Sequence, residues 1–202
     1  MAAETKRVRR TVEASRQAIL EAAELYLAAD GPEGVKVQRI ARDLGLTDAA
    51  IHYHFGNREG LLEALLRFSG RRFLGELEGA MATQDAADFD LPRAAALLAE
   101  LYERRGAARL AMWLTLSGWS PHGDGMLRPL AEWLHAARAR RAAAAGQPAP
   151  ELADSQKGIA LLSAVTFAQA LAGDAHLRSV GLTAVSSEAF LAWLTERMEA
   201  PT

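Results

Sequence analysis

Histidine, serine and aspartate side chains, which could do catalytic or metal chemistry, gather in two short segments of this 202-residue chain. Ser120, His122 and Asp124 are the residue types of a hydrolytic triad, but they are crowded into one segment rich in glycine and proline, where such residues form turns. His52 and His54 lie two residues apart, and on a helix they point about 200° away from each other, so they cannot share a metal ion. The chain shows no Gly-rich phosphate loop and no paired-carboxylate motif, and it contains no cysteine. These patterns predict a protein that is not an enzyme and that uses no metal or cofactor.

The composition is that of a folded, helical chain. Half of the residues are hydrophobic and 24% are charged, so a sizeable core can form. Alanine-rich stretches favour helix, and no segment alternates polar and apolar residues with the period of a strand. Turn residues divide the chain into nine expected helices, at residues 12–29, 37–44, 48–54, 58–81, 91–105, 107–118, 126–145, 151–175 and 187–199. The predicted fold class is therefore all-α.

No segment is typical of export or of a membrane span. The charged N-terminus is not followed by an apolar run, as it would be in a secretory signal. The longest uncharged stretch, residues 158–173, contains Ser163, Thr166 and Gln169 and is too short and too polar for a membrane helix. A chain without cysteine also suits a reducing compartment. We therefore expect a cytoplasmic protein with no membrane partner.

Positive charge is concentrated at the N-terminus. Residues 1–72 carry 12 Lys and Arg against 10 Asp and Glu, whereas residues 73–202 carry 11 against 15. The first residues form a basic arm, which contains Lys6, Arg7, Arg9, Arg10 and Arg16. Such an arm indicates a polyanionic partner at this end of the chain, and a solvated terminus is the alternative interpretation.

Between Val37 and His54 the sequence predicts two short helices joined by a tight turn. Gly45 can adopt the left-handed conformation that ends the first helix, and Thr47 can cap the second. The residues expected to face the other helix are Val37, Ile40, Ala41, Leu44, Leu46 and Ile51. In a helix-turn-helix of this kind the second helix lies in the major groove of DNA. An ordinary helical hairpin within a bundle is the alternative.

Residues from about Gln17 to Leu66 resemble the DNA-binding domain of the TetR family of transcriptional regulators. The stretches that carry the resemblance are residues 22–26 before Gly31, residues 37–41 before residues 44–47, and residues 51–55 before residues 57–62. The resemblance covers about a quarter of the chain. It implies a helix-turn-helix domain with a basic arm over residues 1–57 and a helical effector-binding and dimerisation domain over residues 58–202. A helix at about residues 58–81 would connect the two. Tyr26 and Phe55 are expected to be core residues only, and Asn57 is expected to cap the connecting helix.

The resemblance also implies roles for individual residues toward DNA. Gln38, Ala49, Ala50 and Tyr53 match positions that reach bases, and Lys36, His52, His54 and Arg58 match positions that approach phosphates. The side chains suit these roles, since Gln can pair with adenine, Ala can pack on the thymine methyl group, and Asp48 can accept from cytosine. The predicted DNA-binding set is Lys36, Gln38, Thr47, Asp48, Ala49, Ala50, His52, Tyr53, His54 and Arg58. Lys36 stands where the family usually has a capping Thr or Ser, and His52 where Tyr is common, which makes that contact shorter and sensitive to pH.

Two further sets of residues are expected in the second domain. Three of the four tryptophans lie between residues 113 and 133, and large apolar side chains there could line a pocket for a hydrophobic or planar effector. The predicted ligand site consists of Met112, Trp113, Leu116, Trp119, His122, Met126, Trp133, Phe167, Gln169 and His176. The predicted dimer interface consists of Leu162, Val165, Phe190, Trp193 and Leu194. For both sets, burial in the core of one chain is the alternative.

The function predicted is that of a homodimeric DNA-binding transcriptional regulator, in particular a repressor, which binds an approximately palindromic operator under the control of a small-molecule effector. Two other functions stay open at this point. The chain could be a helical small-molecule-binding protein without specific DNA binding, or, with less support, an enzyme on the same bundle.

Overall fold

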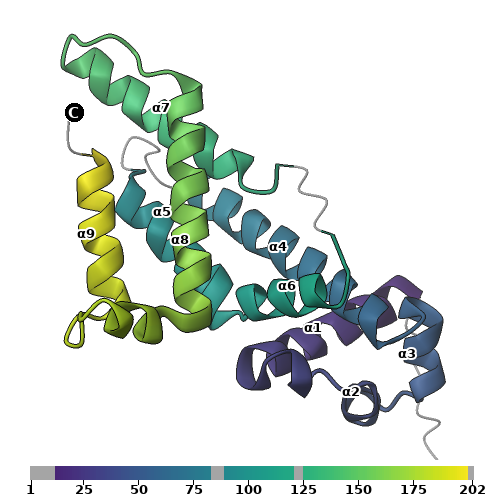
Figure 1. Cartoon of the computed structure of the whole chain (residues 1–202). Coiled ribbons are helices and arrows are strands. Elements are labelled where there is room, and N and C mark those ends of the chain that lie inside the picture. The colour runs from purple at the N-terminus through teal and green to yellow at the C-terminus, as the bar shows by residue number, and fades with distance from the viewer. Residues whose placement is uncertain (1–11, 83–88, 121–124, 200–202) are drawn as a thin grey trace, which may run out of the picture. The chain divides into compact units, whose positions relative to one another are not determined.

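The computed structural model describes residues 12–82, 89–120 and 125–199, and within these ranges the regular structure is entirely helical (Figure 1). The described residues form nine α-helices: α1 (Val12–Asp30), α2 (Val37–Leu44), α3 (Asp48–Phe55), α4 (Arg58–Ala82), α5 (Leu91–Ala99), α6 (Ala107–Leu116), α7 (Arg128–Ala144), α8 (Leu152–Ser179) and α9 (Ser187–Glu199). The all-α prediction is therefore confirmed. His122, Asp124 and the basic residues Lys6, Arg7, Arg9 and Arg10 lie outside the described residues.

Two helices differ in their course from the sequence prediction. The expected helix over residues 91–105 ends at Ala99 and continues as a stretch of π-helix, η3 (Glu100–Arg104). There the Arg105 N–H donates to the carbonyl of Glu100, five residues back, at 3.0 Å, which widens the turn. Helix α8 runs to Ser179, beyond the predicted end at residue 175, and has a kink at Ala172, where φ is −153°.

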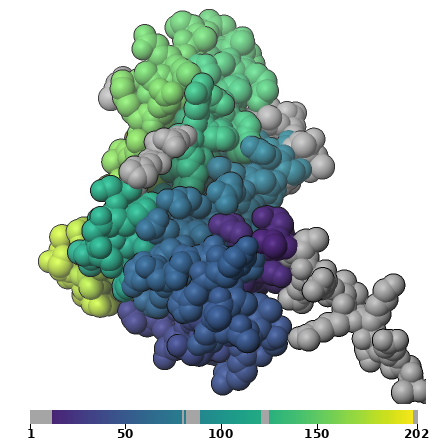
Figure 2. Space-filling model, turned by 90° about the vertical axis from the view of Figure 1, so that its right-hand side faces the viewer, coloured from purple at the N-terminus to yellow at the C-terminus, as the bar shows by residue number. Residues whose placement is uncertain are grey.

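The chain divides into two compact units, Met1–Phe68 and Ser69–Thr202, and the division falls within α4. The first unit contains α1, the short 3-10 turn η1 (Pro32–Gly34), α2, α3 and the start of α4. Its core consists of the fully buried side chains Ile19, Leu20, Leu27, Val35, Ile40, Leu61, Leu62 and Leu65. Figure 2 shows the region of α2 and α3, in dark blue, as a continuous surface of this unit.

The second unit is a helical bundle built around α8. Helices α5, α6, α7 and α9 all pack against α8, and α5 also packs against α9 (Figure 1). The buried side chains at the centre of this bundle include Leu98, Leu101, Leu110, Leu134, Ile159 and Leu162. By length and hydropathy alone, α8 could cross a membrane, although a core helix of a globular protein passes the same test. Only 22% of its most apolar window is buried within the chain, so α8 also presents an apolar face to its surroundings.

Candidate DNA-binding interface

The turn between α2 and α3 is closed by main-chain hydrogen bonds that require a left-handed residue. Gly45 has φ 64° and ψ 32°, as the sequence predicted. The Leu46 N–H donates to the carbonyl of Ala41 at 2.8 Å, and the Gly45 N–H donates to that of Arg42 at 3.2 Å. This is the hydrogen-bond pattern of a Schellman motif, in which glycine is preferred because a Cβ disfavours positive φ. The turn therefore fixes the direction in which α3 leaves α2.

Helix α3 is held at its start and along its inner side. The Thr47 Oγ1 accepts from the N–H of Ala50 at 3.2 Å, so the predicted cap is formed. Ile51 is 1% exposed and anchors α3 in the core of the unit, to which α2 contributes Ile40 and Ala41. Because Ile51 holds the inner side of the short helix, the residues on its other side are free to meet a partner.

The connection between α3 and α4 is fixed by a helix cap and by a close main-chain approach. The Asn57 Oδ1 accepts from the N–H of Gly60 at 2.8 Å, which confirms the predicted cap of α4. A Cβ on Gly60 would lie 2.2 Å from the carbonyl oxygen of Phe55, so only glycine fits there. The end of α3 is thus pressed directly against the first turn of α4.

Most of the predicted DNA-binding residues lie on the open side of α2 and α3. Lys36, Gln38, Thr47, Ala49, His52 and Tyr53 are exposed, and Asp48, Ala50 and His54 are half-buried. Tyr53 is 77% exposed, and its ring meets that of His54 in a T-shaped contact at 5.4 Å between centroids. Ala49, His52 and Tyr53 are three and four residues apart and share one face of α3. The Lys36 side chain forms no cap of α2, as expected.

The hydrogen bond of His52 fixes the position of a proton on its ring. The Nδ1 atom lies 3.0 Å from the carbonyl oxygen of Gly56, which can only accept, so Nδ1 carries the proton. In the neutral ring Nε2 is then an acceptor, and it can donate to a phosphate only when the ring is doubly protonated. His52 and His54 belong to no group of three or more potential metal ligands within the described part of the chain.

Arg58 has partners inside the unit that the resemblance to TetR regulators did not imply. Its Nη2 donates to the carbonyl of Pro32 at 2.6 Å, and its Nε donates to the carbonyl of Val35 at 3.1 Å. The carboxylate of Glu33 lies 4.0 Å away, and 28% of the Arg58 side chain is exposed. The guanidinium thus ties η1 to the start of α4. A phosphate contact would have to compete with these bonds.

The expectation that Tyr26 and Phe55 are core residues only is wrong, because both are half-buried and take part in surface contacts. The Tyr26 hydroxyl donates to the carboxylate of Asp43, and this hydrogen bond raises the pKa of Tyr26 above its ordinary value. The guanidinium of Arg39 lies 4.0 Å from the centre of the Tyr26 ring. That of Arg16 lies 5.1 Å from the centre of the Phe55 ring. These contacts join α1 to α2 and α3. They could not be predicted from the sequence, because the partners are far apart in the chain.

The predicted ligand-site residues differ in their contacts and in their burial. The Trp133 ring packs against Phe89 at 6.0 Å, and the Phe167 ring packs against Tyr102 at 5.4 Å. Leu116 is 81% exposed, His176 is exposed, Met112 and Met126 are partly exposed, and Trp113 and Trp119 are half-buried. Gln169 lines a groove between α5, α8 and α9, which the sequence did not indicate. Small alanines form much of that groove, whereas the prediction followed large aromatic residues.

Of the predicted dimer residues, Leu162 cannot contact a partner, because its side chain has no exposed surface in the single chain. Trp193 is 51% exposed and its ring stacks on Phe190 at 5.7 Å, so this pair is open to a partner. Val165 and Leu194 are half-buried. The exposed stripe of α8 consists instead of Ala160, Leu161, Ala164 and Ala168.

The first unit therefore has the features of a helix-turn-helix DNA-binding domain: a tight glycine turn, a capped and anchored second helix, and an open face that carries amide, hydroxyl and aromatic groups. Comparison with known proteins agrees. Residues 19–65 match the family model described as bacterial regulatory proteins, tetR family. The HTH-type transcriptional repressor AcnR of Corynebacterium glutamicum is 43% identical over 58 residues, which are 29% of this chain and 31% of AcnR.

Two solved structures share the fold along almost the whole chain. One, from work on the control of antibiotic production by a bacterial hormone, has a TM-score of 0.59 and 20% identity and covers 94% of this chain and 97% of its own. The other, a protein of unknown function from Rhodococcus sp. RHA1, has a TM-score of 0.52 and 20% identity and covers 96% and 97%. The similarity to the tetR family of bacterial regulatory proteins thus lies in the N-terminal domain, at residues 19–65.

Proposed function

We propose that this protein is a transcriptional repressor that binds operator DNA through α2 and α3. The observation that carries the proposal is the open face of α3, on which Tyr53 is 77% exposed while Ile51 on the opposite side is 1% exposed. Ala49 and His52 are also exposed and share this face of α3 with Tyr53, so the helix presents a continuous row of side chains to a partner. Gln38 and Ala49, which are also exposed, supply groups that can read base edges. AcnR, which is similar over this domain, is named a repressor.

The second part of the proposal is that the protein acts as a two-fold dimer through α8 and α9. The exposed stripe Ala160, Leu161, Ala164 and Ala168 has the spacing of one helix face, and its small residues allow another helix to approach closely. Trp193 on α9 adds a large exposed apolar surface. A second copy would cover the apolar face of α8 without a membrane, in keeping with a cytoplasmic regulator. A two-fold dimer would read an approximately palindromic operator.

Control by an effector follows from linkage. A small molecule that binds more tightly to the conformation with a wrong spacing of the two α3 helices must weaken DNA binding by the same factor. In this proposal residues 1–57 bind DNA, residues 58–202 bind the effector and the partner copy, and α4 connects the two functions.

The test is selection of the purified protein against a random duplex pool at about 0.15 M salt, followed by sequencing of the retained DNA. Enrichment of a near-palindromic site supports the proposal. Sedimentation of the protein with that duplex then gives the number of copies bound. Retention without any preferred sequence, lost as salt rises, contradicts specific operator recognition and leaves a ligand-binding helical protein as the better account.

A further inference from the structure

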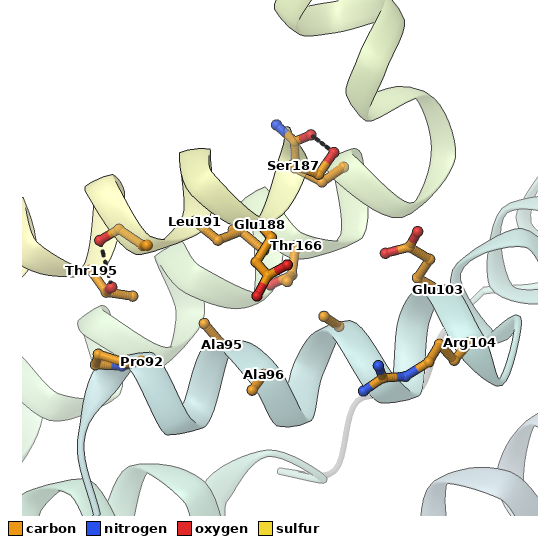
Figure 3. Close-up of a pocket in the computed structure, with 13 residues that line it drawn as sticks. Pro92, Ala95, Ala96, Glu103, Arg104, Thr166, Ser187, Glu188, Leu191 and Thr195 are labelled. Atoms are coloured by element: carbon orange, nitrogen blue, oxygen red, sulfur yellow. Dashed lines mark hydrogen bonds between the residues drawn. The ribbon is translucent and has the colours of Figure 1, made fainter. Parts of the chain in front are cut away.

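The second unit contains a groove of about 400 Å³ between α5, α8 and α9 (Figure 3). Its apolar wall is made chiefly by Ala95, Ala96 and Ala99 of α5, with Leu191 of α9 facing them. The space exists because these α5 side chains are single methyl groups where leucine would fill the gap. The groove is large enough for a small organic molecule.

The two buried hydroxyl groups beside the groove donate their protons to main-chain carbonyls. Thr166 is 2% exposed and Thr195 is 0% exposed. The Thr166 hydroxyl donates to the carbonyl of Leu162, and the Thr195 hydroxyl donates to that of Ala192 at 2.9 Å. Each hydroxyl oxygen therefore keeps its ability to accept a hydrogen bond but has no proton left to donate.

The hydroxyl group of Ser187, at the far end of the groove, also donates its proton within the chain. Ser187 donates to the Oε1 of Gln169 at 3.2 Å, so the Ser187 oxygen is likewise left as an acceptor. The amide N–H groups of Gln169 stay available as donors. On balance the groove offers more acceptors than donors to a molecule that enters it.

The charged residues along the groove also favour a ligand that donates hydrogen bonds. Glu103 and Glu188 line it, and neither forms an ion pair with another residue in the part of the chain that the structure describes. Figure 3 shows the Glu188 carboxylate reaching from α9 into the gap above α5, with the Glu103 carboxylate farther along the same gap. The third charged residue, Arg104, is bound by the carboxylate of Glu100. The groove therefore carries net negative charge.

A shallower recess continues the groove along α8. It shares Glu103, Gln169 and Ser187 with the groove and adds Asp174 and Arg178, whose opposite charges offset each other. The excess of carboxylate thus persists over the combined length.

We propose that this groove is the effector site of the regulator and that it takes an organic ammonium ion with a small apolar body. An ammonium group brings three N–H donors and one positive charge, which match the carboxylates of Glu103 and Glu188 and the acceptor oxygen of Ser187 at the end of the groove. The apolar body packs on the alanines of α5 and on Leu191. An anionic ligand would instead face two carboxylates and hydroxyl groups without spare protons. The proposal rests on the proposed function, and it replaces the tryptophan-rich region as the site of the effector.

The experiment compares three probes of similar shape on the full-length, DNA-free protein: 2-phenylethylamine, 2-phenylethanol and 3-phenylpropanoate. Binding is measured by calorimetry at low and at about 0.15 M salt. The amine is expected to bind at least about tenfold more tightly than the alcohol, with an affinity that falls as salt rises, and the acid is expected not to bind. Preference for the acid, equal binding of amine and alcohol, or no binding of the amine at millimolar concentration overturns the proposal.

Variants locate the site. Glu188→Gln is expected to weaken amine binding at least about fivefold, because a charged partner is lost at an exposed position that does not hold the fold. Glu196→Gln, on the same helix and outside the groove, is the matched control and is expected to change nothing. Ala96→Leu fills the groove and is expected to abolish binding. Equal effects of the two Gln variants would show that only the overall charge matters and would overturn the assignment.

Duplex selection without the amine separates this proposal from the proposed function. If a specific duplex is enriched and the amine binds the groove but leaves the duplex affinity unchanged, the groove is not the effector site. If the amine binds as expected and no duplex is enriched, the groove is a cation site and the operator-binding proposal is the part that fails.

Discussion

The family resemblance and the structure imply different roles for Arg58: a contact with DNA phosphates, or a link that stabilises the fold. If the side chain contacts DNA phosphates, its removal should weaken binding to every duplex. If its bonds to the carbonyls of Pro32 and Val35 are its main role, removal should destabilise the protein and leave the electrostatics of DNA binding unchanged. We expect the second result for Arg58→Ala.

The expected loss of stability follows from the number and type of the bonds. Hydrogen bonds from a charged group are worth about 1.5–3 kcal/mol each. Arg58 donates one to the carbonyl of Pro32 and one to that of Val35, and 28% of its side chain is exposed to water. After a reduction for this exposure, we expect Arg58→Ala to cost roughly 3 kcal/mol. For a chain of this size, that corresponds to a fall of roughly 6–12 °C in Tm.

The assay combines thermal unfolding with DNA binding measured over a range of salt concentrations, well below the Tm of the variant. A lost phosphate contact would lower the slope of log K against log salt by about 0.9, whereas a structural role leaves it unchanged. Arg58→Lys is the matched control. The lysine ammonium group would preserve a phosphate contact, but it cannot donate to the carbonyls of both Pro32 and Val35 as the guanidinium does. An unchanged Tm together with a reduced salt slope for Arg58→Ala would refute the structural role.

Two other predictions concern recognition and pH. Tyr53→Ala is expected to weaken binding to the selected duplex by roughly 1–3 kcal/mol without lowering Tm, and Leu25→Ala, which removes another exposed side chain of the same unit (74%), is its control; equal affinities for both variants would remove Tyr53 from the interface. In the second unit, the hydrogen bond from Arg105 holds the pKa of Glu76 below its ordinary value. A lowered carboxyl pKa stabilises the fold above the pKa of the unfolded chain, and this contribution is lost as pH falls through the folded-state pKa. The stability advantage of the wild type over Glu76→Gln, measured by urea unfolding, is therefore expected to be larger at about pH 6 than at about pH 3, and a constant difference would contradict the argument.

Local chemistry explains which parts of the fold the sequence could predict. The ends of α2 and α3 were predictable because Gly45, Thr47 and Asn57 act within a few residues of their own position. The π-helical turn after α5 was not, because helix-forming residues continue through it. The kink at Ala172 was not predictable either, because alanine favours a regular helix.

The same distinction applies to the sites. The open face of α2 and α3 follows from helix periodicity and from a motif of nearly fixed length. Leu162 was placed at a surface because its apolar spacing does not say which neighbour covers it, and it is fully buried within one chain. The groove along α5 could not be predicted from the sequence. Alanines such as Ala96 indicate only a helix, and the space beside them depends on how α8 and α9 pack against α5.

The close contact between the Phe55 carbonyl and Gly60 has a consequence for anyone who wishes to move DNA specificity from one regulator to another. A transplant that ends at residue 57 would separate the Asn57 side chain from the amide of Gly60 that it caps, and would place a foreign residue against the Phe55 oxygen. The smallest exchangeable piece therefore runs from Thr47, which caps α3, to Gly60. Within that segment the exposed residues of α3 can be replaced, provided that Thr47, Asn57 and Gly60 are transferred together with the helix.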